Sequence, residues 1–295
     1  PTQVYAAMEF VFYYFTPSMA AAVIFTLLFA SSSLLHLYQL VRTRTWFMIP
    51  FCVGAVLETI GYIGRILSSK EAPDFTKGPY IMQSALILIA PAFLAASIYM
   101  TLGRIIHMLD AEKISLIRVG WLTKIFVGGD VLSFLMQASG AGILVSSSNG
   151  PSTGEHIIIG GLFVQIVFFG LFAISAVIFQ TRVNKAPTGR SIELKHIWTR
   201  HMMALYVASI LILIRSVVRV VEYLEGYDGY LMKHEVFIYV FDALLMFITV
   251  LALIYVHPSQ INVLIGRGTK YSEKAVRIHV YTPTSVLEMD RSTDV

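Results

Sequence analysis

Four stretches of this 295-residue chain contain no aspartate, glutamate, lysine or arginine: residues 10–41, 78–103, 131–154 and 157–181. A helix needs about 20 mainly apolar residues to cross the hydrocarbon core of a bilayer. Each of the four stretches is therefore long enough to cross once, and further apolar segments with a few charges lie between them. The sequence predicts a membrane protein.

The overall composition excludes several other classes of protein. Hydrophobic residues make up 56% of the chain and charged residues 14%, whereas soluble domains carry about 25% charged residues. A disordered chain and a coiled coil are excluded on the same grounds, and a single cysteine excludes a disulfide-stabilised domain. The net charge of +4 is explained without a nucleic-acid partner if the basic residues gather on one membrane face. We therefore expect no nucleic-acid partner.

The apolar pattern predicts an all-α polytopic protein with seven transmembrane helices. We expect a short extracellular segment at residues 1–15, a seven-helix domain at 16–256, and a polar cytosolic tail at 257–295, partly disordered beyond Gly268. The predicted helices lie near 16–41, 46–68, 80–103, 121–146, 157–180, 201–224 and 235–256.

The distribution of basic residues predicts the orientation of the chain. With the N-terminus outside, sixteen lysines and arginines fall on the cytosolic side and three, Lys70, Lys77 and Lys233, fall outside. Cytosolic loops of membrane proteins carry an excess of basic residues. We therefore expect the N-terminus outside and the C-terminus in the cytosol.

The most informative residues are ionisable groups placed inside the predicted spans, where each costs several kcal/mol unless it is paired or hydrated. Glu58, Tyr62 and Arg65 are spaced i, i+4 and i+7, so they share one helix face. Comparable spacings occur in the sixth and seventh predicted helices. In the seventh helix, Glu235 shares one face with Tyr239 and Asp242. The predicted ligand-binding cavity consists of Glu58, Tyr62, Arg65, Gln83, Asp130, Gln137, Gln165, Arg215, Arg219, Glu222, Tyr239 and Asp242.

Four acids and three arginines among these residues are close to balance, which predicts that they pair around one cavity open toward the outer side. The alternative is that the charges only hold the helices together and set their register. Pro91 is predicted to kink the third helix, because it removes a backbone hydrogen bond.

Several functions of membrane proteins lack their required residues. The seventh helix has no lysine to anchor retinal, and the chain has no Walker loop for ATP. A zinc hydrolase needs about three ligands clustered at one depth, but only His36 lies well within a predicted span. We therefore expect no catalytic residue, no metal site and no bound cofactor.

The motifs in these spans resemble those of the fungal lipid-translocating exporter family, the RTA-like proteins named for resistance to aminocholesterol. The resemblance covers residues 14–258, and its motifs lie at 58–65, 83–99, 126–142, 161–165, 215–226 and 235–258. It implies a seven-helix protein of a fungal plasma membrane or internal membrane. The family is linked to sphingoid-base translocation, to tolerance of sterol analogues and azoles and, in one branch, to porphyrin uptake.

These observations support a binding or translocation protein for a lipid or amphiphile with a charged head. The acids of the cavity would hold a cationic amine such as a sphingoid base, and the arginines would hold phosphate or carboxylate groups. A lipid-sensing receptor or stress-response regulator is an alternative. Porphyrin or haem binding is a further one, in which the arginines meet propionates.

Overall fold

The computed structural model describes residues 13, 16–146, 152–226 and 229–269. Most of the predicted N-terminal segment and all of the tail from 270 onward, including its expected disorder, lie outside these residues. The described elements follow in chain order: α1 (Met19–Thr43), η1 (Trp46–Met48), α2 (Ile49–Lys70), α3 (Lys77–Met108), α4 (Val119–Ser146), α5 (Ser152–Lys185), α6 (Gly189–Glu193), α7 (Lys195–Glu225), α8 (Tyr230–Lys233), α9 (Glu235–Ile238), η2 (Tyr239–Leu244), α10 (Leu245–Tyr255) and α11 (Ser259–Leu264).

Seven helices are long and apolar enough to cross a membrane, as predicted, and the described residues contain no strand. Most of the helices extend beyond the predicted ranges; α5, for example, was expected at 157–180 and covers Ser152–Lys185, whereas α1 was expected from residue 16 and begins at Met19. Charged residues are tolerated where a helix leaves the hydrocarbon, so hydropathy locates the apolar centre of a span better than its ends. The predicted polar tail also begins with a short helix, α11, whose Ile261 is fully buried.

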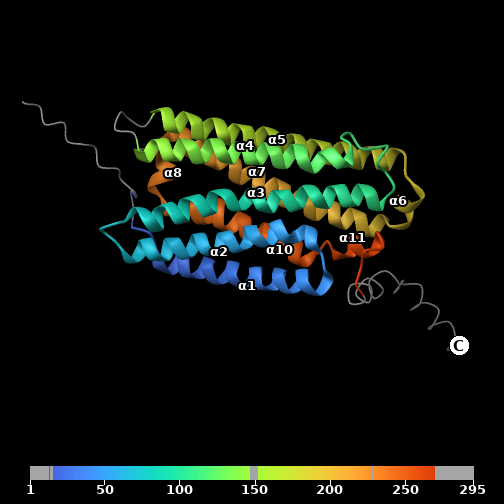
Figure 1. Ribbon diagram of the computed structural model, residues 1–295, viewed down its shortest axis with the longest axis horizontal. Helices are drawn as coiled ribbons and strands as arrows, with labels where there is room; N and C mark the ends of the chain where they lie inside the picture. The colour runs from blue at the N-terminus through green and yellow to red at the C-terminus, as the bar shows by residue number, and fades with distance from the viewer. Residues whose placement is uncertain (1–12, 14–15, 147–151, 227–228, 270–295) are drawn as a thin grey trace, which may run out of the picture.

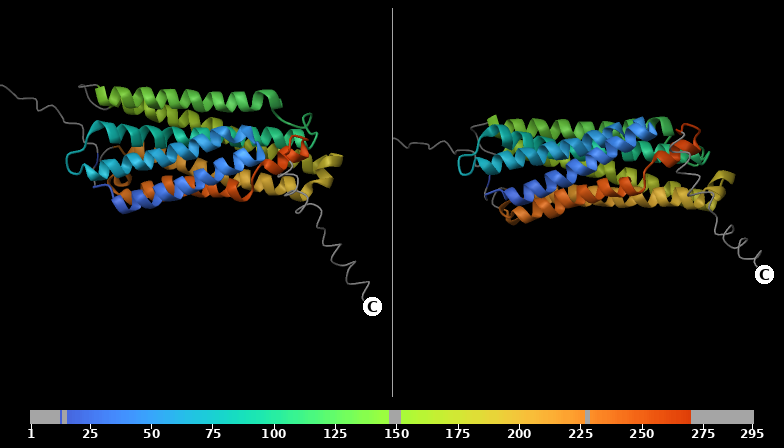
Figure 2. Two further views of the ribbon diagram at one scale, coloured as in Figure 1. Left: turned by 60° about the horizontal axis from the view of Figure 1, so that its bottom comes forward. Right: turned by 90° about the horizontal axis from the view of Figure 1, so that it is seen from below.

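The spans form an elongated bundle in which α3 lies between α2 and α4 and also packs against α7 (Figure 1). Helix α1 packs on α2 and α10, and α4 and α5 form an antiparallel pair next to α3 and α7. The short helices α6 and α11 lie at one end of the bundle and α8 lies at the other (Figures 1 and 2). The seventh span, Glu235–Leu264, consists of α9, η2 and α10 in succession and ends with α11.

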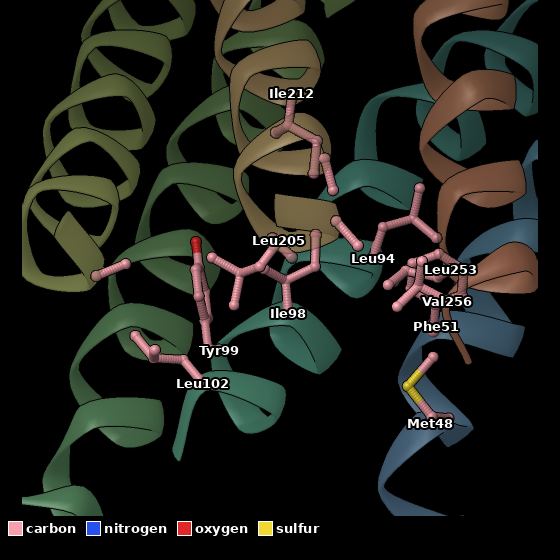
Figure 3. Packing of buried hydrophobic residues seen from close by; sticks show 14 of the residues in the cluster. Met48, Phe51, Leu94, Ile98, Tyr99, Leu102, Leu205, Ile212, Leu253 and Val256 are labelled. Carbon is pink, nitrogen blue, oxygen red and sulfur yellow. The ribbon is translucent and has the colours of Figure 1, made fainter. Parts of the chain in front are cut away.

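Apolar packing fills the half of the bundle nearer α6 and α11. Leu94, Ile98 and Leu102 of α3 face Leu205 and Ile212 of α7, with residues of α2 and the seventh span beside them (Figure 3). The Ser97 hydroxyl accepts a hydrogen bond from the Phe51 backbone N–H (2.9 Å) and donates one to the Phe47 carbonyl (3.2 Å). Side chains of α3 thereby satisfy backbone groups at the start of α2 that the helix itself leaves unbonded.

The lipid-facing surface is apolar and is bordered by aromatic and basic residues at one end. Leu27 and Leu34 of α1 are 65% and 68% exposed. At the end that carries α6 and α11, Arg200 lies over the ring of Tyr255 (5.0 Å) and Lys124 over the ring of Trp121 (5.6 Å). Aromatic side chains with basic neighbours are typical of the membrane–water interface, and this pattern supports the assignment of the chain as an integral membrane protein.

Close packing of α4 on α5 depends on small residues. A Cβ atom added to Gly161 would lie 2.8 Å from the Ser133 carbonyl oxygen, whereas one added to Gly170, on the same helix, would meet nothing within 4 Å. We expect Gly161→Ala to destabilise the protein by about 1–3 kcal/mol through overpacking and Gly170→Ala to have little effect. Thermal unfolding of both variants in detergent tests this, and equal unfolding temperatures would contradict it.

Candidate functional site

The centre of the site is the carboxylate of Asp242 on η2, which lies between two arginines of α7. Arg215 Nε donates to Asp242 Oδ1 and Arg219 Nη2 donates to Asp242 Oδ2, so each oxygen has its own arginine. Arg219 Nη1 also donates to Glu222 Oε2 at 3.1 Å. The side chains of Arg215 and Asp242 are 1% and 4% exposed, whereas those of Arg219 and Glu222 are 18% and 12% exposed. The chain of ion pairs therefore runs from the protein interior toward its surface.

Spacing on α7 explains why one carboxylate meets both arginines. Arg215 and Arg219 are four residues apart and point from the same face of the helix. Opposite them, residues Tyr239–Leu244 form a π-helical segment. A π turn holds one more residue than an α turn and is frequent at functional sites. The sequence spacing did predict that the charged residues of these two spans share a face, but it did not predict the π-helical segment.

Pro91 of α3 provides a second anchor for Arg215. Because proline has no backbone N–H, the carbonyl four residues earlier, that of Ile87, loses its helical partner. Arg215 Nη2 donates to this Ile87 oxygen at 2.8 Å. The proline that was predicted only to kink the helix thus frees an acceptor for a buried arginine.

Arg65 of α2 belongs to a second group of ion pairs. Its Nη2 donates to Glu235 Oε1 at 2.6 Å, and its Nε donates to the Tyr239 hydroxyl at 2.9 Å. Both oxygens of Glu235 also accept from the Ser18 backbone N–H at 2.9 Å. Glu235 was not among the predicted cavity residues, although its spacing of four residues from Tyr239 places both side chains on one face. This group joins the beginning of α1 to α2 and to the seventh span.

Glu58 and Tyr62 of α2 lie near both groups without bonding to either. Glu58 is 0% exposed, and neither of its oxygens has a hydrogen-bond partner within the part of the chain that the structure describes. It interacts electrostatically with Asp242, Arg215 and Arg219. The Tyr62 hydroxyl is also buried without a partner there, and its ring stacks on that of Phe29 at 5.6 Å.

The remaining predicted residues form separate groups. Asp130 of α4 accepts a hydrogen bond from the Tyr99 hydroxyl of α3 at 2.8 Å. Gln137 Nε2 donates to Ser133 Oγ at 2.7 Å and to Gln165 Oε1 at 3.4 Å. Gln83 accepts from the Tyr13 hydroxyl at 3.1 Å.

The expectation that all seven charges pair in one network is therefore wrong: Arg65 pairs with Glu235 in the second group, Glu58 has no bonding partner among the described residues, and Asp130 bonds to Tyr99. The bonding partner of Asp130 comes from α3, and α3 lies between α4 and α2 (Figure 1). Sequence spacing gave the face of each helix but not which neighbouring helix that face would meet.

A small hollow of about 10 Å³, close to the space that one water molecule needs, lies beside the ion pairs, between α7 and the seventh span. Four charged side chains line it together with five apolar ones: Arg215, Arg219, Glu222 and Asp242 with Val218, Leu231, Phe237, Ile238 and Phe241. The rings of Phe237 and Phe241 stack on each other, with centroids 6.1 Å apart and an angle of 11° between the ring planes. The hollow thus combines ionic groups with aromatic surface.

Seven membrane-spanning helices around a buried group of ion pairs, with a mixed ionic and apolar hollow beside them, define a polytopic integral membrane protein with an intramembrane polar site. The chain belongs to the family described as RTA1 like protein, whose model matches residues 51–263. The family resemblance predicted from the motifs is thereby confirmed.

Several proteins of Saccharomyces cerevisiae are similar to this chain. Protoporphyrin uptake protein 1 is 39% identical over 82% of this chain and 90% of its own length. Protein RTA1 is 39% identical over 84% of this chain and 85% of its own. Sphingoid long-chain base transporter RSB1 is 28% identical over 76% and 67%. No solved structure matches the chain.

The shared carboxylate gives a test of the site's contribution to stability. Asp242→Asn leaves two arginines facing a neutral amide, and removing one partner of a buried ion pair costs about 3–5 kcal/mol. We expect a large fall in the thermal unfolding temperature in detergent. Asp130→Asn is the matched control, because an amide oxygen can still accept from Tyr99. Equal losses in the two variants would contradict the pairing.

Proposed function

We propose that this protein binds and translocates an amphiphile with a charged head and an apolar tail. The observation that supports this most directly is the hollow between α7 and the seventh span, where charged groups and aromatic rings line the same space. Ligand sites in membrane proteins combine apolar walls with a few placed polar groups in this way.

Exposure indicates which charges would meet the head group first. Glu222 and Arg219 are the more accessible members of the ion-pair chain, while Arg215 and Asp242 are almost fully buried. A head group entering from the α7 side would therefore meet Glu222 and Arg219, and its tail would lie against Phe237 and Phe241. Charge-assisted hydrogen bonds to these two residues would position the head.

The relatives favour the same general class of ligand. One is named as a transporter of sphingoid long-chain bases and another as a protoporphyrin uptake protein. A sphingoid base has a cationic amine and an apolar chain, and a porphyrin has anionic propionates on an apolar ring. Both are amphiphiles. The amine is opposite in charge to the acids of the ion-pair chain, and the propionates are opposite in charge to its arginines. The sequence contains no ATP-binding loop, so we propose that movement is facilitated or coupled to an ion gradient.

We propose the cationic amphiphile as the first candidate because two acids, Glu222 and Asp242, line the hollow. Glu222→Gln is expected to weaken binding of a fluorescent long-chain amine about tenfold, which corresponds to about 1.4 kcal/mol. Phe241→Ala is expected to weaken it through lost apolar contact, whereas Phe163→Ala, an exposed aromatic on α5, is the control. Fluorescence titration of purified protein in nanodiscs measures this.

Unchanged amine binding in both Glu222→Gln and Phe241→Ala would contradict the proposed site. Binding to the wild type without accelerated movement of the probe in reconstituted vesicles would instead indicate a lipid-sensing receptor. These outcomes separate a translocating protein from a lipid-sensing receptor.

A porphyrin is the second candidate, and the position of Arg219 at the edge of the hollow favours it. The relative named for protoporphyrin uptake also covers most of this chain. If the ligand is a porphyrin, Arg219→Gln would weaken protoporphyrin binding about tenfold, while Glu222→Gln would not weaken it. Absorbance titration with protoporphyrin measures this, and the opposite ranking of the two variants would exclude it.

We also propose that the end with α6 and α11 faces the cytosol. The aromatic and basic pairs at Arg200 and Lys124 lie at that end, and most of the basic residues belong to its loops. In this orientation the ion pairs and the hollow lie in the outer half of the membrane.

A further inference from the structure

Among the described residues, Glu58 is the one buried charged residue of α2, α7 and the seventh span that the ion pairs do not use. Three arginines and three acids of these spans are paired in the described structure: Arg65 with Glu235, Arg215 and Arg219 with Asp242, and Arg219 with Glu222. Their charges sum to zero. An ionised Glu58 would therefore add one uncompensated negative charge to a buried network.

The described residues around Glu58 offer no hydrogen bond to compensate that charge. Both of its oxygens are buried without a partner among the described residues. Gly54 and Gly61 lie on the same face of α2, and Cβ atoms added to them would lie 2.9 Å from the Ala90 carbonyl oxygen and 2.7 Å from Ile87 Cγ1. The two glycines thus bring α3 close against α2 on either side of Glu58. An isolated buried carboxylate costs far more than a neutral carboxylic acid in such a place.

We infer that Glu58 is a proton-binding site, which holds a proton when the hollow is empty and releases it when a cationic head group binds there. The cationic cargo rests on the proposed function. In this exchange one positive charge enters the network as one leaves, so the buried charge stays balanced. The proton leaves the carboxyl oxygen for water, and no other bond is made or broken.

The ion pairs provide a physical link between Glu58 and the hollow. The groups that interact electrostatically with Glu58 are Asp242 of η2 and Arg215 and Arg219 of α7, with Tyr62 as a titratable neighbour on its own helix. Among the described residues, α1 and α3 add no charged group to this set.

Deprotonated Glu58 competes with Asp242 for the two arginines. An arginine that moves toward Glu58 leaves one oxygen of Asp242 available to the hollow, which Asp242 lines. A bound ammonium group then replaces the arginine as the partner of that oxygen. An anionic head group would add negative charge and would therefore keep the proton on Glu58.

The proton is detected directly by infrared spectroscopy. A protonated carboxyl group has a C=O stretching band that a carboxylate lacks. We expect the difference spectrum between wild type and Glu58→Gln, at neutral pH and without ligand, to show this band in the wild type. Its absence would overturn the inference, whether or not the protein moves any lipid.

The exchange is measured with a ligand that carries a fixed charge. Dodecyltrimethylammonium has no proton of its own, so any proton released when it binds comes from the protein. In wild-type nanodiscs we expect release of about one proton for each probe bound, read from a pH-sensitive dye. Glu58→Gln is expected to bind the probe and to release none, and dodecyl sulfonate is expected to release none from the wild type.

Asp130→Asn is the matched control, since it removes another buried carboxyl group whose partner is Tyr99. It is expected to release protons like the wild type. Equal release from wild type and Glu58→Gln would overturn the exchange. If the wild type does not bind the ammonium probe at all, the proposed cargo fails and so does the exchange, while the infrared band separately decides whether Glu58 holds a proton.

Discussion

The Asp242 carboxylate joins α7 to the seventh span because each of its oxygens accepts a hydrogen bond from a different arginine. In a low-dielectric interior such a pairing is favourable only when all its polar atoms find partners. Two irregular features supply the geometry. The π-helical segment carries Asp242, and Pro91 frees the Ile87 carbonyl oxygen that Arg215 also contacts. Both features would weaken an isolated helix, and here the interactions of the two arginines compensate for that.

The seven spans could be predicted from the sequence because the cost of placing charges in hydrocarbon acts on each segment separately. The same holds for the faces of single helices, such as the one shared by Arg215 and Arg219. The bonding partners could not be predicted, because they depend on how neighbouring helices rotate and which of them touch. Glu235 was overlooked as the partner of Arg65 for this reason, and Asp130 was assigned to a network from which α3 separates it.

The apolar core continues through both halves of the bundle, but only one half adds buried ion pairs to it among the described residues. Near α6 and α11, interdigitated side chains such as Leu94, Leu205 and Leu253 pack tightly (Figure 3). In the other half, ion pairs connect α2, α7 and the seventh span. Close apolar packing resists rearrangement, whereas an arginine can change carboxylate partners with little change in the number of ion pairs.

This difference places the part of the molecule suited to a change of state beside the hollow. Arg219 already contacts two acids, Glu222 and Asp242, and a third acid, Glu58, interacts with it electrostatically. A buried network with more acids than arginines cannot ionise all of them at once without an uncompensated charge. The surplus acid is therefore either neutral or balanced by a cation from outside the protein. That requirement links the protonation of Glu58 on α2 to the occupancy of a site formed by α7 and the seventh span.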